Sequence, residues 1–271
     1  MKYGEILFLG GCNLNCYYCL QHEMRKLKKE QENQLNIHFN KWNNFENFIN
    51  ICKKEKINKI FLSSTSSEPT LYVYLQELII KLKKEGFKVG LRSNGYFAIE
   101  NIDAILECDE EISFSVNSLK SKTNYKICGV EKIPDWDKLL SIISNNKKSC
   151  RISVVVNRFN VNEITQILDF FNKYTCIEYI QLRKVYKYKH RKLLEDLAFH
   201  KIKKWVIKNC KLIGNYFESP IYQYNNINIS LWETVFKKES ISSINYFTNG
   251  LLSNSTLLIP AYENKEGEIN E

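Results

Sequence analysis

Segments with strand-like and helix-like patterns alternate along most of this 271-residue chain, and the alternation limits the folds available to it. Short apolar runs typical of buried strands are separated by longer segments whose apolar residues recur at helical spacing. The predicted strands are 6–9, 59–62, 87–91, 112–116, 152–156 and 177–182. The predicted helices that follow them are 42–52, 71–85, 99–106, 136–143, 164–174 and 193–208. Six strand–helix units favour a parallel sheet with right-handed crossovers.

A parallel sheet of this kind that curves round would form a partial barrel of the TIM type, with functional loops at the carboxyl ends of its strands. After residue 210 the pattern changes to shorter strand-like segments at 212–217, 227–232 and 257–259, with a turn predicted at Asn249-Gly250. We therefore expect an α/β protein with two parts. Residues 1–210 form a partial (βα)6 barrel, and residues 211–271 form a small β-rich C-terminal extension that caps its open, substrate side.

Composition narrows the classes of partner. The chain is 44% hydrophobic and 25% charged, as in ordinary globular proteins. No apolar run approaches the roughly 18 residues that a membrane helix needs, and the first residues lack the layout of a secretory signal, so we expect a cytoplasmic protein with no membrane partner. The formal charge is +9, but the basic residues are mostly lysines, whereas arginine reads phosphates and base edges better. A nucleic-acid partner is therefore only weakly supported.

Three of the nine cysteines are crowded into one short segment directly after the first predicted strand and the pair Gly10-Gly11: Cys12-Asn13-Leu14-Asn15-Cys16-Tyr17-Tyr18-Cys19. The odd number of cysteines and the expected reducing compartment argue against disulfides. Three thiolates on one loop leave a coordination position open on an iron–sulfur cluster or on zinc. A closed Cys3His zinc site with His22 is the alternative, although structural zinc sites usually join two ligand pairs across a longer separation.

The spacing Cys-x-x-x-Cys-x-x-Cys, with Tyr18 before the last cysteine, resembles the signature of the radical S-adenosylmethionine (SAM) enzymes. The resemblance implies that Cys12, Cys16 and Cys19 are the catalytic metal ligands, each bound to one iron of a [4Fe–4S] cluster, and that SAM chelates the fourth iron. It further implies that the reduced cluster cleaves SAM to methionine and a 5′-deoxyadenosyl radical, which abstracts hydrogen from a substrate. An electron donor such as flavodoxin or ferredoxin would reduce the cluster.

Further segments at the ends of later predicted strands resemble motifs of the same family, in the same order. Ser66-Ser67-Glu68-Pro69 is similar to the Gly-Gly-Glu-Pro segment that holds the SAM amino group, with serines replacing both glycines, and Arg92-Ser93-Asn94-Gly95 resembles its Thr-Asn-Gly turn. A carboxylate suits an ammonium group, although Glu68-Pro69 could equally open the next helix. Polar residues also end the fourth and fifth predicted strands. Taken together, these resemblances imply cofactor contacts at Tyr18, Ser67, Glu68, Ser93, Asn94, Ser115, Asn117 and Asn157.

Arg183 ends the sixth predicted strand, where it could meet the SAM carboxylate, an anionic substrate, or a carboxylate at the barrel rim. The resemblance extends over roughly residues 4–210 and is closest to the GTP-cyclase branch of molybdenum cofactor synthesis and to peptide-modifying branches. Because no cysteine follows Cys210, we expect one cluster only. Cys128, in a loop on the predicted catalytic face, is a candidate hydrogen donor to a substrate radical.

The substrate is not identified by these motifs. We expect a small molecule or a peptide, and the positive charge makes RNA or a nucleotide the alternative. A non-catalytic iron–sulfur or zinc module is the alternative from another functional class.

Overall fold

The computed structural model describes residues 2–19, 33–64, 67–185, 193–216, 219–233 and 242–255. All six predicted strands are present, and they pair in parallel with their neighbours in chain order. Their bounds are β1 (Lys2–Phe8), β2 (Lys59–Ser64), β3 (Lys88–Ser93), β4 (Ile112–Ser115), β5 (Cys150–Val156) and β6 (Ile177–Lys184). The predicted parallel sheet is confirmed.

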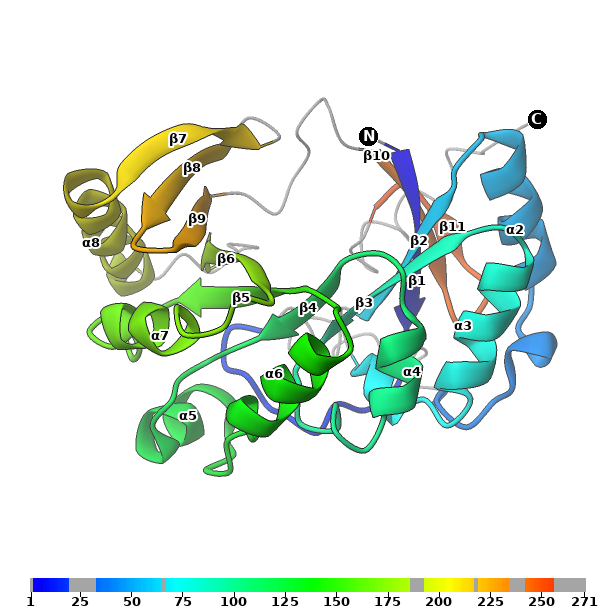
Figure 1. Ribbon diagram of the computed structural model, residues 1–271. Helices are drawn as coiled ribbons and strands as arrows, with labels where there is room; N and C mark the ends of the chain where they lie inside the picture. The colour runs from blue at the N-terminus through cyan, green and yellow to red at the C-terminus, as the bar shows by residue number, and fades with distance from the viewer. Residues whose placement is uncertain are drawn as a thin grey trace.

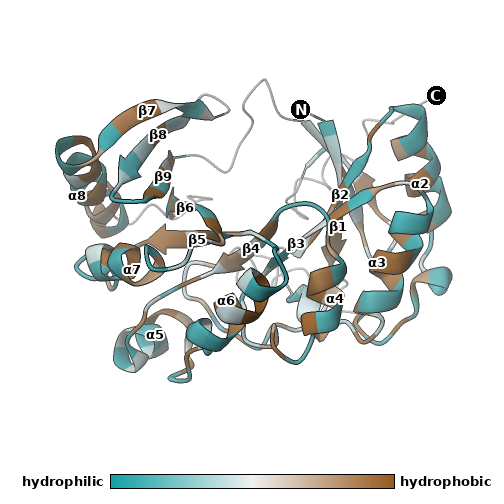
Figure 2. Ribbon diagram, in the orientation of Figure 1, coloured by the Kyte–Doolittle hydropathy of each residue, from teal (hydrophilic) through white to brown (hydrophobic). Residues whose placement is uncertain are grey.

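The helices lie along the outer side of this curved sheet (Figure 1). They are α2 (Phe45–Lys54), α3 (Leu75–Lys84), α4 (Ile102–Glu107), α5 (Ser121–Cys128), α6 (Trp136–Asn145), α7 (Ile164–Phe171) and α8 (Leu193–Asn209), with short 3-10 turns η1 (Phe39–Lys41) and η2 (Pro69–Leu71). Their apolar stripes face the strands, as the banded colouring of α3 and α4 in Figure 2 illustrates. None of the described helices is both long and apolar enough to cross a membrane.

The helix α5 was not predicted from the sequence. Its eight residues bury only Asn124, Ile127 and Cys128, so it lacks the apolar periodicity from which the other helices were recognised. Gly129 ends it with a φ of 77°, a left-handed conformation that glycine adopts without strain.

The residues after 210 extend the same sheet at both of its edges. At one edge, β10 (Ser242–Phe247) pairs in parallel with β1, and β11 (Leu252–Ser253) follows it. At the other edge, β9 (Ile227–Trp232) pairs in parallel with β6. Next to β9 in the sheet lie β8 (Ser219–Tyr224) and then β7 (Lys211–Tyr216), each antiparallel to its neighbour. The β-rich character of this region was predicted, although β8, β10 and β11 were not, and the predicted strand 257–259 lies outside the described residues. The division into two domains at residue 210 stays a prediction.

The result is an 11-stranded sheet in the order β11-β10-β1-β2-β3-β4-β5-β6-β9-β8-β7. Within the described ladders its two ends do not pair, so the strands form an open, partial barrel. Figure 1 shows β7 to β9 facing β1 and β10 across the opening.

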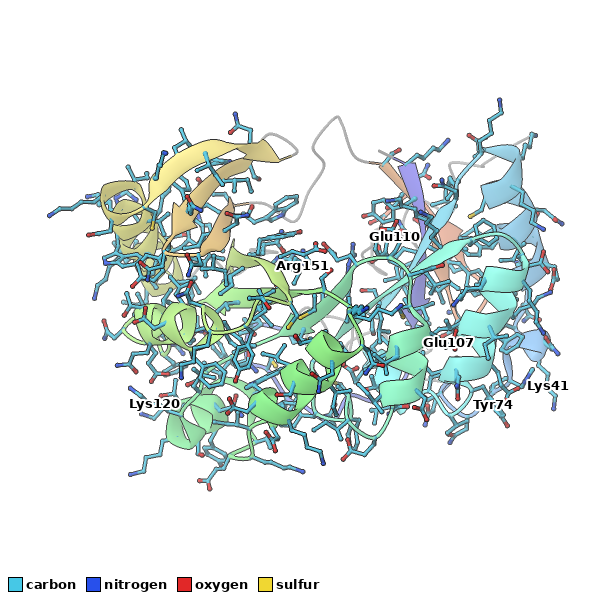
Figure 3. The ribbon with its side chains drawn as sticks, in the orientation of Figure 1. Lys41, Tyr74, Glu107, Glu110, Lys120 and Arg151 are labelled. Carbon is cyan, nitrogen blue, oxygen red and sulfur yellow. The ribbon has the colours of Figure 1, made fainter. Side chains whose placement is uncertain are left out.

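The two faces of the sheet differ in chemistry. On the helix side, residues such as Ile6 and Phe8 belong to the main apolar core. We call the other side, which carries Glu5, Arg92 and Arg151, the concave face. In Figure 3, Arg151 lies inside the curve of the sheet, whereas Lys120 lies on the outer surface.

Candidate functional site

The cysteine loop begins where β1 ends, and two features direct its path away from the strand. Gly10 has a φ of 144°, and a Cβ there would lie 2.9 Å from Asn33 Oδ1 and 3.0 Å from Leu35 Cγ. Leu9 donates its backbone N–H to Thr248 Oγ1 at 3.0 Å, and this contact ties the loop to the residue after β10. The loop therefore needs glycine at this point and depends on a partner more than 200 residues away in sequence.

The middle of the loop is held against the C-terminal end of α5. The backbone N–H groups of Asn15 and Tyr17 donate to the carbonyls of Cys128 and Ile127, both at 2.9 Å. A helix leaves its last carbonyls without intrahelical partners, so these bonds satisfy groups that would otherwise need water. The prediction that Cys128 lies in a loop is wrong, because Cys128 is the last residue of α5. Its buried thiol lies 3.2 Å from the Asn124 carbonyl, within hydrogen-bonding distance.

The three cysteines of the loop are partly exposed and lie close enough to influence one another electrostatically. Burial raises the pKa of Cys12 to about 11, with Cys19 adding to the shift. Burial also raises the pKa of Cys16, with Cys19 and Cys12 contributing. Grouped thiolates in a half-buried place repel one another, and a bound cationic centre removes that cost while protons are released. The donor set therefore fits a thiolate-bound metal centre.

The described residues leave open both kinds of centre that the sequence allows, an iron–sulfur cluster and zinc. Among the described residues, no three His, Cys, Asp or Glu side chains gather round one point as ligands of a single ion do. The thiolates of a [4Fe–4S] cluster each bind a different iron, so they need not converge in that way. His22, the fourth ligand of the zinc alternative, lies outside the described residues.

Glu68 is buried and links the ends of β2 and β3. Its Oε1 accepts the Thr70 N–H, the Thr70 hydroxyl and the Ser93 hydroxyl at 3.1, 2.8 and 2.7 Å, and its Oε2 accepts the Asn94 N–H at 2.8 Å. Burial raises the pKa of the Glu68 carboxyl, and these hydrogen bonds oppose the rise. The Glu68-Pro69 pair also opens η2, as the alternative interpretation proposed. Glu68 thus positions Ser93 and Asn94 at the carboxyl end of β3.

Asn94 connects this network to the cysteine loop. Its side-chain amide donates to Asn13 Oδ1 at 2.8 Å and lies 3.7 Å from the Cys12 sulfur. On the neighbouring side of the loop, the Ser67 hydroxyl donates to the Gly11 carbonyl at 2.9 Å. Both contacts bring residues predicted from the sequence, one after β2 and one after β3, to the segment that carries Cys12.

Tyr18 joins the loop to the end of β4. Its hydroxyl donates to Asn117 Oδ1 at 2.6 Å, and the Asn117 carbonyl accepts the Asn160 amide at 2.9 Å. Ser115, the last residue of β4, is exposed on the concave face. Asn157 is fully buried, and its side chain closes the turn after β5 through the Phe159 N–H and the Val155 carbonyl. Its cofactor contact stays a prediction.

Other residues of the site were missed from the sequence. Glu195 of α8 is 2% exposed. It accepts the Tyr17 hydroxyl at 2.8 Å and the Arg158 N–H at 2.9 Å. Arg158 also packs over the Tyr17 ring. No local signal marks Glu195, because an acidic residue in the first turn of a helix is ordinary.

Comparison with known proteins identifies the class. Residues 6–171 match the sequence profile of the Radical SAM superfamily. The chain belongs to the radical SAM superfamily. The radical SAM resemblance predicted from the cysteine spacing is thereby confirmed, and the protein is an enzyme of this class.

Individual relatives agree with this assignment. The chain is 27% identical over 179 residues to the S-adenosyl-L-methionine-dependent tRNA 4-demethylwyosine synthase of Methanocaldococcus jannaschii, covering 61% of this chain and 55% of that protein. It is 25% identical over 182 residues to the GTP 3',8-cyclase of Campylobacter fetus subsp. fetus, covering 63% and 52%. The chain thus spans about half the length of these curated relatives.

The fold is shared with Streptococcus suis SuiB, which was crystallised with S-adenosylmethionine bound. The TM-score is 0.64 at 16% identity, covering 93% of this chain and 60% of SuiB. Similarity to the GTP cyclase was expected from the strand-end motifs of this radical SAM protein.

Proposed function

We propose that this radical SAM protein holds one [4Fe–4S] cluster on Cys12, Cys16 and Cys19 and uses it with SAM on a small-molecule or peptide substrate. The bound cluster would supply the electron that cleaves SAM to methionine and a 5′-deoxyadenosyl radical able to abstract hydrogen. The observation that carries the proposal is the position of the three thiols, on the loop after β1 at the carboxyl end of a partial barrel.

The surrounding residues have separate roles in this proposal. Ser67 and Asn94, which contact the cysteine loop, lie where they can bind the polar groups of SAM. Glu68 and Ser93 hold the Asn94 turn, and the four donors on Glu68 make it a positioning residue first. Tyr18, Ser115, Asn117 and Asn157 are proposed on the β4 and β5 side. The protein's contribution is to orient the cofactor and exclude side reactions.

The substrate class is supported by the fold. SuiB, whose structural alignment with this protein covers 93% of this chain, has also been crystallised bound to the precursor peptide SuiA. RNA modification is the second candidate, because the tRNA 4-demethylwyosine synthase is similar over 61% of the chain. A flavodoxin or ferredoxin is the proposed electron donor in both cases.

The experiment is anaerobic reconstitution of the full chain with iron and sulfide, followed by addition of SAM and dithionite. We expect about four irons per chain and formation of 5′-deoxyadenosine. Serine variants of Cys12, Cys16 and Cys19 should each lose the cluster and the product. The control is Cys210→Ser, which changes a partly exposed cysteine outside the loop and should retain both.

Two outcomes would contradict the proposal. Stoichiometric zinc with no 5′-deoxyadenosine from the intact chain would favour the non-catalytic module. About eight irons per chain would contradict the single cluster. Tight binding of a tRNA transcript that weakens steeply with salt would favour RNA as the substrate.

A further inference from the structure

The concave face of the barrel carries polar side chains in rows, because residues paired in a parallel sheet point to the same side. One row runs Arg92, Ser113, Arg151 and Tyr179 across β3 to β6. The next row toward the carboxyl ends is Ser115, Ser153, Gln181 and Ser230, across β4 to β9. Arg183 lies in the row above, between Val155 and Trp232, at the end nearest the cysteine loop.

Two of the three arginines on this face have carboxylate partners. Arg92 donates to Glu5 Oε1 at 2.6 Å and lies over the Phe61 ring. Arg151 lies 3.1 Å from Glu111 Oε1 and donates to Gln181 Oε1 at 2.8 Å. These charges are therefore balanced within the sheet, and the pairs form a fixed polar wall.

Arg183 differs from both. Within the part of the chain that the structure describes, its guanidinium has no hydrogen bond and no carboxylate partner, although the residue is half-buried. Burial, together with the charges of Arg151 and Arg92, lowers the pKa of Arg183 to about 10, while Tyr18 and Glu5 oppose the shift. Tyr18 of the cysteine loop and Glu5 thus favour the charged form of the guanidinium, but among the described residues no carboxylate forms an ion pair with it.

Within the described part of the chain, further buried polar atoms on the concave face lack hydrogen-bond partners. Ser230 Oγ, one row below Arg183, is buried and has no hydrogen bond, and neither amide atom of Asn245 has one. Asn245 pairs in register with Glu5 and is fully buried. Buried polar groups are usually satisfied, so such atoms on one face point to a bound polar partner or to ordered water.

We propose that Arg183 binds an anionic group of the substrate, a carboxylate or a phosphate, on the concave face beside the cysteine loop. Ser115 and Ser153, in the row below, are placed to add hydrogen bonds. A guanidinium recognises both kinds of anion through paired N–H donors. This inference rests on the proposed function and specifies the substrate that the same site accepts.

A small anion fits this position better than an RNA backbone does. Phosphate tracking along RNA needs several exposed cations in a continuous stripe. On the described part of the concave face, Arg92 and Arg151 have the carboxylate partners Glu5 and Glu111, which leaves Arg183 as the arginine placed to bind one anionic group.

The test measures the affinity of inorganic phosphate and of acetate for the reconstituted full chain in the presence of SAM, at constant ionic strength. We expect saturable binding of at least one anion to the wild type. Arg183→Gln should weaken it by about tenfold or more, since a hydrogen bond to a charged group is lost. The matched control is Lys184→Gln, which changes the next residue of β6, whose side chain pairs with Asp196 of α8. The anion affinity of this variant should stay within about twofold of the wild type.

The unfolding temperatures of the variants show whether a loss of anion binding reflects a loss of the fold. Because Arg183 has no described carboxylate partner, Arg183→Gln should unfold at the same temperature as the wild type or higher, whereas Arg151→Gln should unfold at a lower temperature because it leaves Glu111 unpaired.

Four results bear directly on the inference. Absence of saturable anion binding by the wild type, or equal anion affinities for Arg183→Gln and the wild type, would overturn it. Weaker SAM binding by Arg183→Gln with unchanged anion binding would assign the guanidinium to the SAM carboxylate and would also overturn it. Loss of anion binding in Arg183→Gln would support it even if the wild type formed no 5′-deoxyadenosine, an outcome that counts only against the proposed function.

Discussion

The substitution Glu68→Gln replaces a buried side chain that only accepts hydrogen bonds with one that also donates them. Ionised Glu68 accepts four bonds, three on Oε1 from Thr70 and Ser93 and one on Oε2 from the Asn94 N–H. Glutamine has a single oxygen. If that oxygen takes the Oε1 position, the NH2 group faces the Asn94 N–H. If the amide is reversed, the NH2 group faces the Thr70 N–H, so one backbone donor is left unpaired in either orientation.

The cost follows from that unpaired donor. A buried N–H without a partner costs about 1–3 kcal/mol, and the lost bond to a carboxylate is stronger than one between neutral groups. The variant no longer buries a charge, which offsets part of the loss. We expect the free energy of unfolding to fall by about 2 kcal/mol, measured as a lower urea midpoint with an unchanged slope. SAM affinity should also fall, because the Asn94 turn shifts.

The matched control is Glu163→Gln. Glu163 is also buried, but its carboxylate accepts the hydroxyls of Ser118 and Thr123 at 2.5 and 2.6 Å and lies 3.8 Å from Lys120 Nζ. Hydroxyls can rotate and accept from the new amide, so this variant should lose less than about 1 kcal/mol. Equal losses in the two variants would refute the reasoning, since burial alone would then explain both.

Two further predictions concern the framework. Gly90→Ala should lower the free energy of unfolding by about 1–3 kcal/mol, since its Cβ would lie 2.6 Å from the Phe61 ring. Gly11→Ala is the control and should leave the free energy of unfolding unchanged, because no atom lies within 4 Å of its Cβ. Equal urea midpoints for the two variants would contradict this prediction. Hydrogen bonds from Lys53 and Lys81 lower the pKa of Glu85 to about 2 from 4.5, so its stabilisation is present above pH 4.5 and is lost as the pH falls toward 2. Between pH 4.5 and 2, the free energy of unfolding in urea should fall by up to about 1 kcal/mol more for the wild type than for Glu85→Gln. Parallel plots of unfolding free energy against pH for the two proteins would count against the ion pair.

Much of the core was predictable because its strands and helices are local patterns. The six parallel strands were recognised from short apolar runs, and the amphipathic helix α3 from Leu75, Leu78, Ile79 and Leu82. The short helix α5 was not, since its stability comes from packing and from the cysteine loop bound at its end. The strand β10 was missed for a similar reason, because it is defined by its pairing with β1.

The sequence by itself determined the chemistry class of the protein, since the spacing of Cys12, Cys16 and Cys19 after a strand is a local feature that needs no knowledge of distant partners. Only the tertiary structure decided which groups surround those thiols. Glu195 reaches Tyr17 from 178 residues away, and Leu9 meets Thr248 across 239. The same holds for Arg183, whose position was predicted at the end of a strand. Among the described residues, two other arginines on its face have carboxylate partners and Arg183 has none, which depends on the strand register that aligns side chains from separate segments.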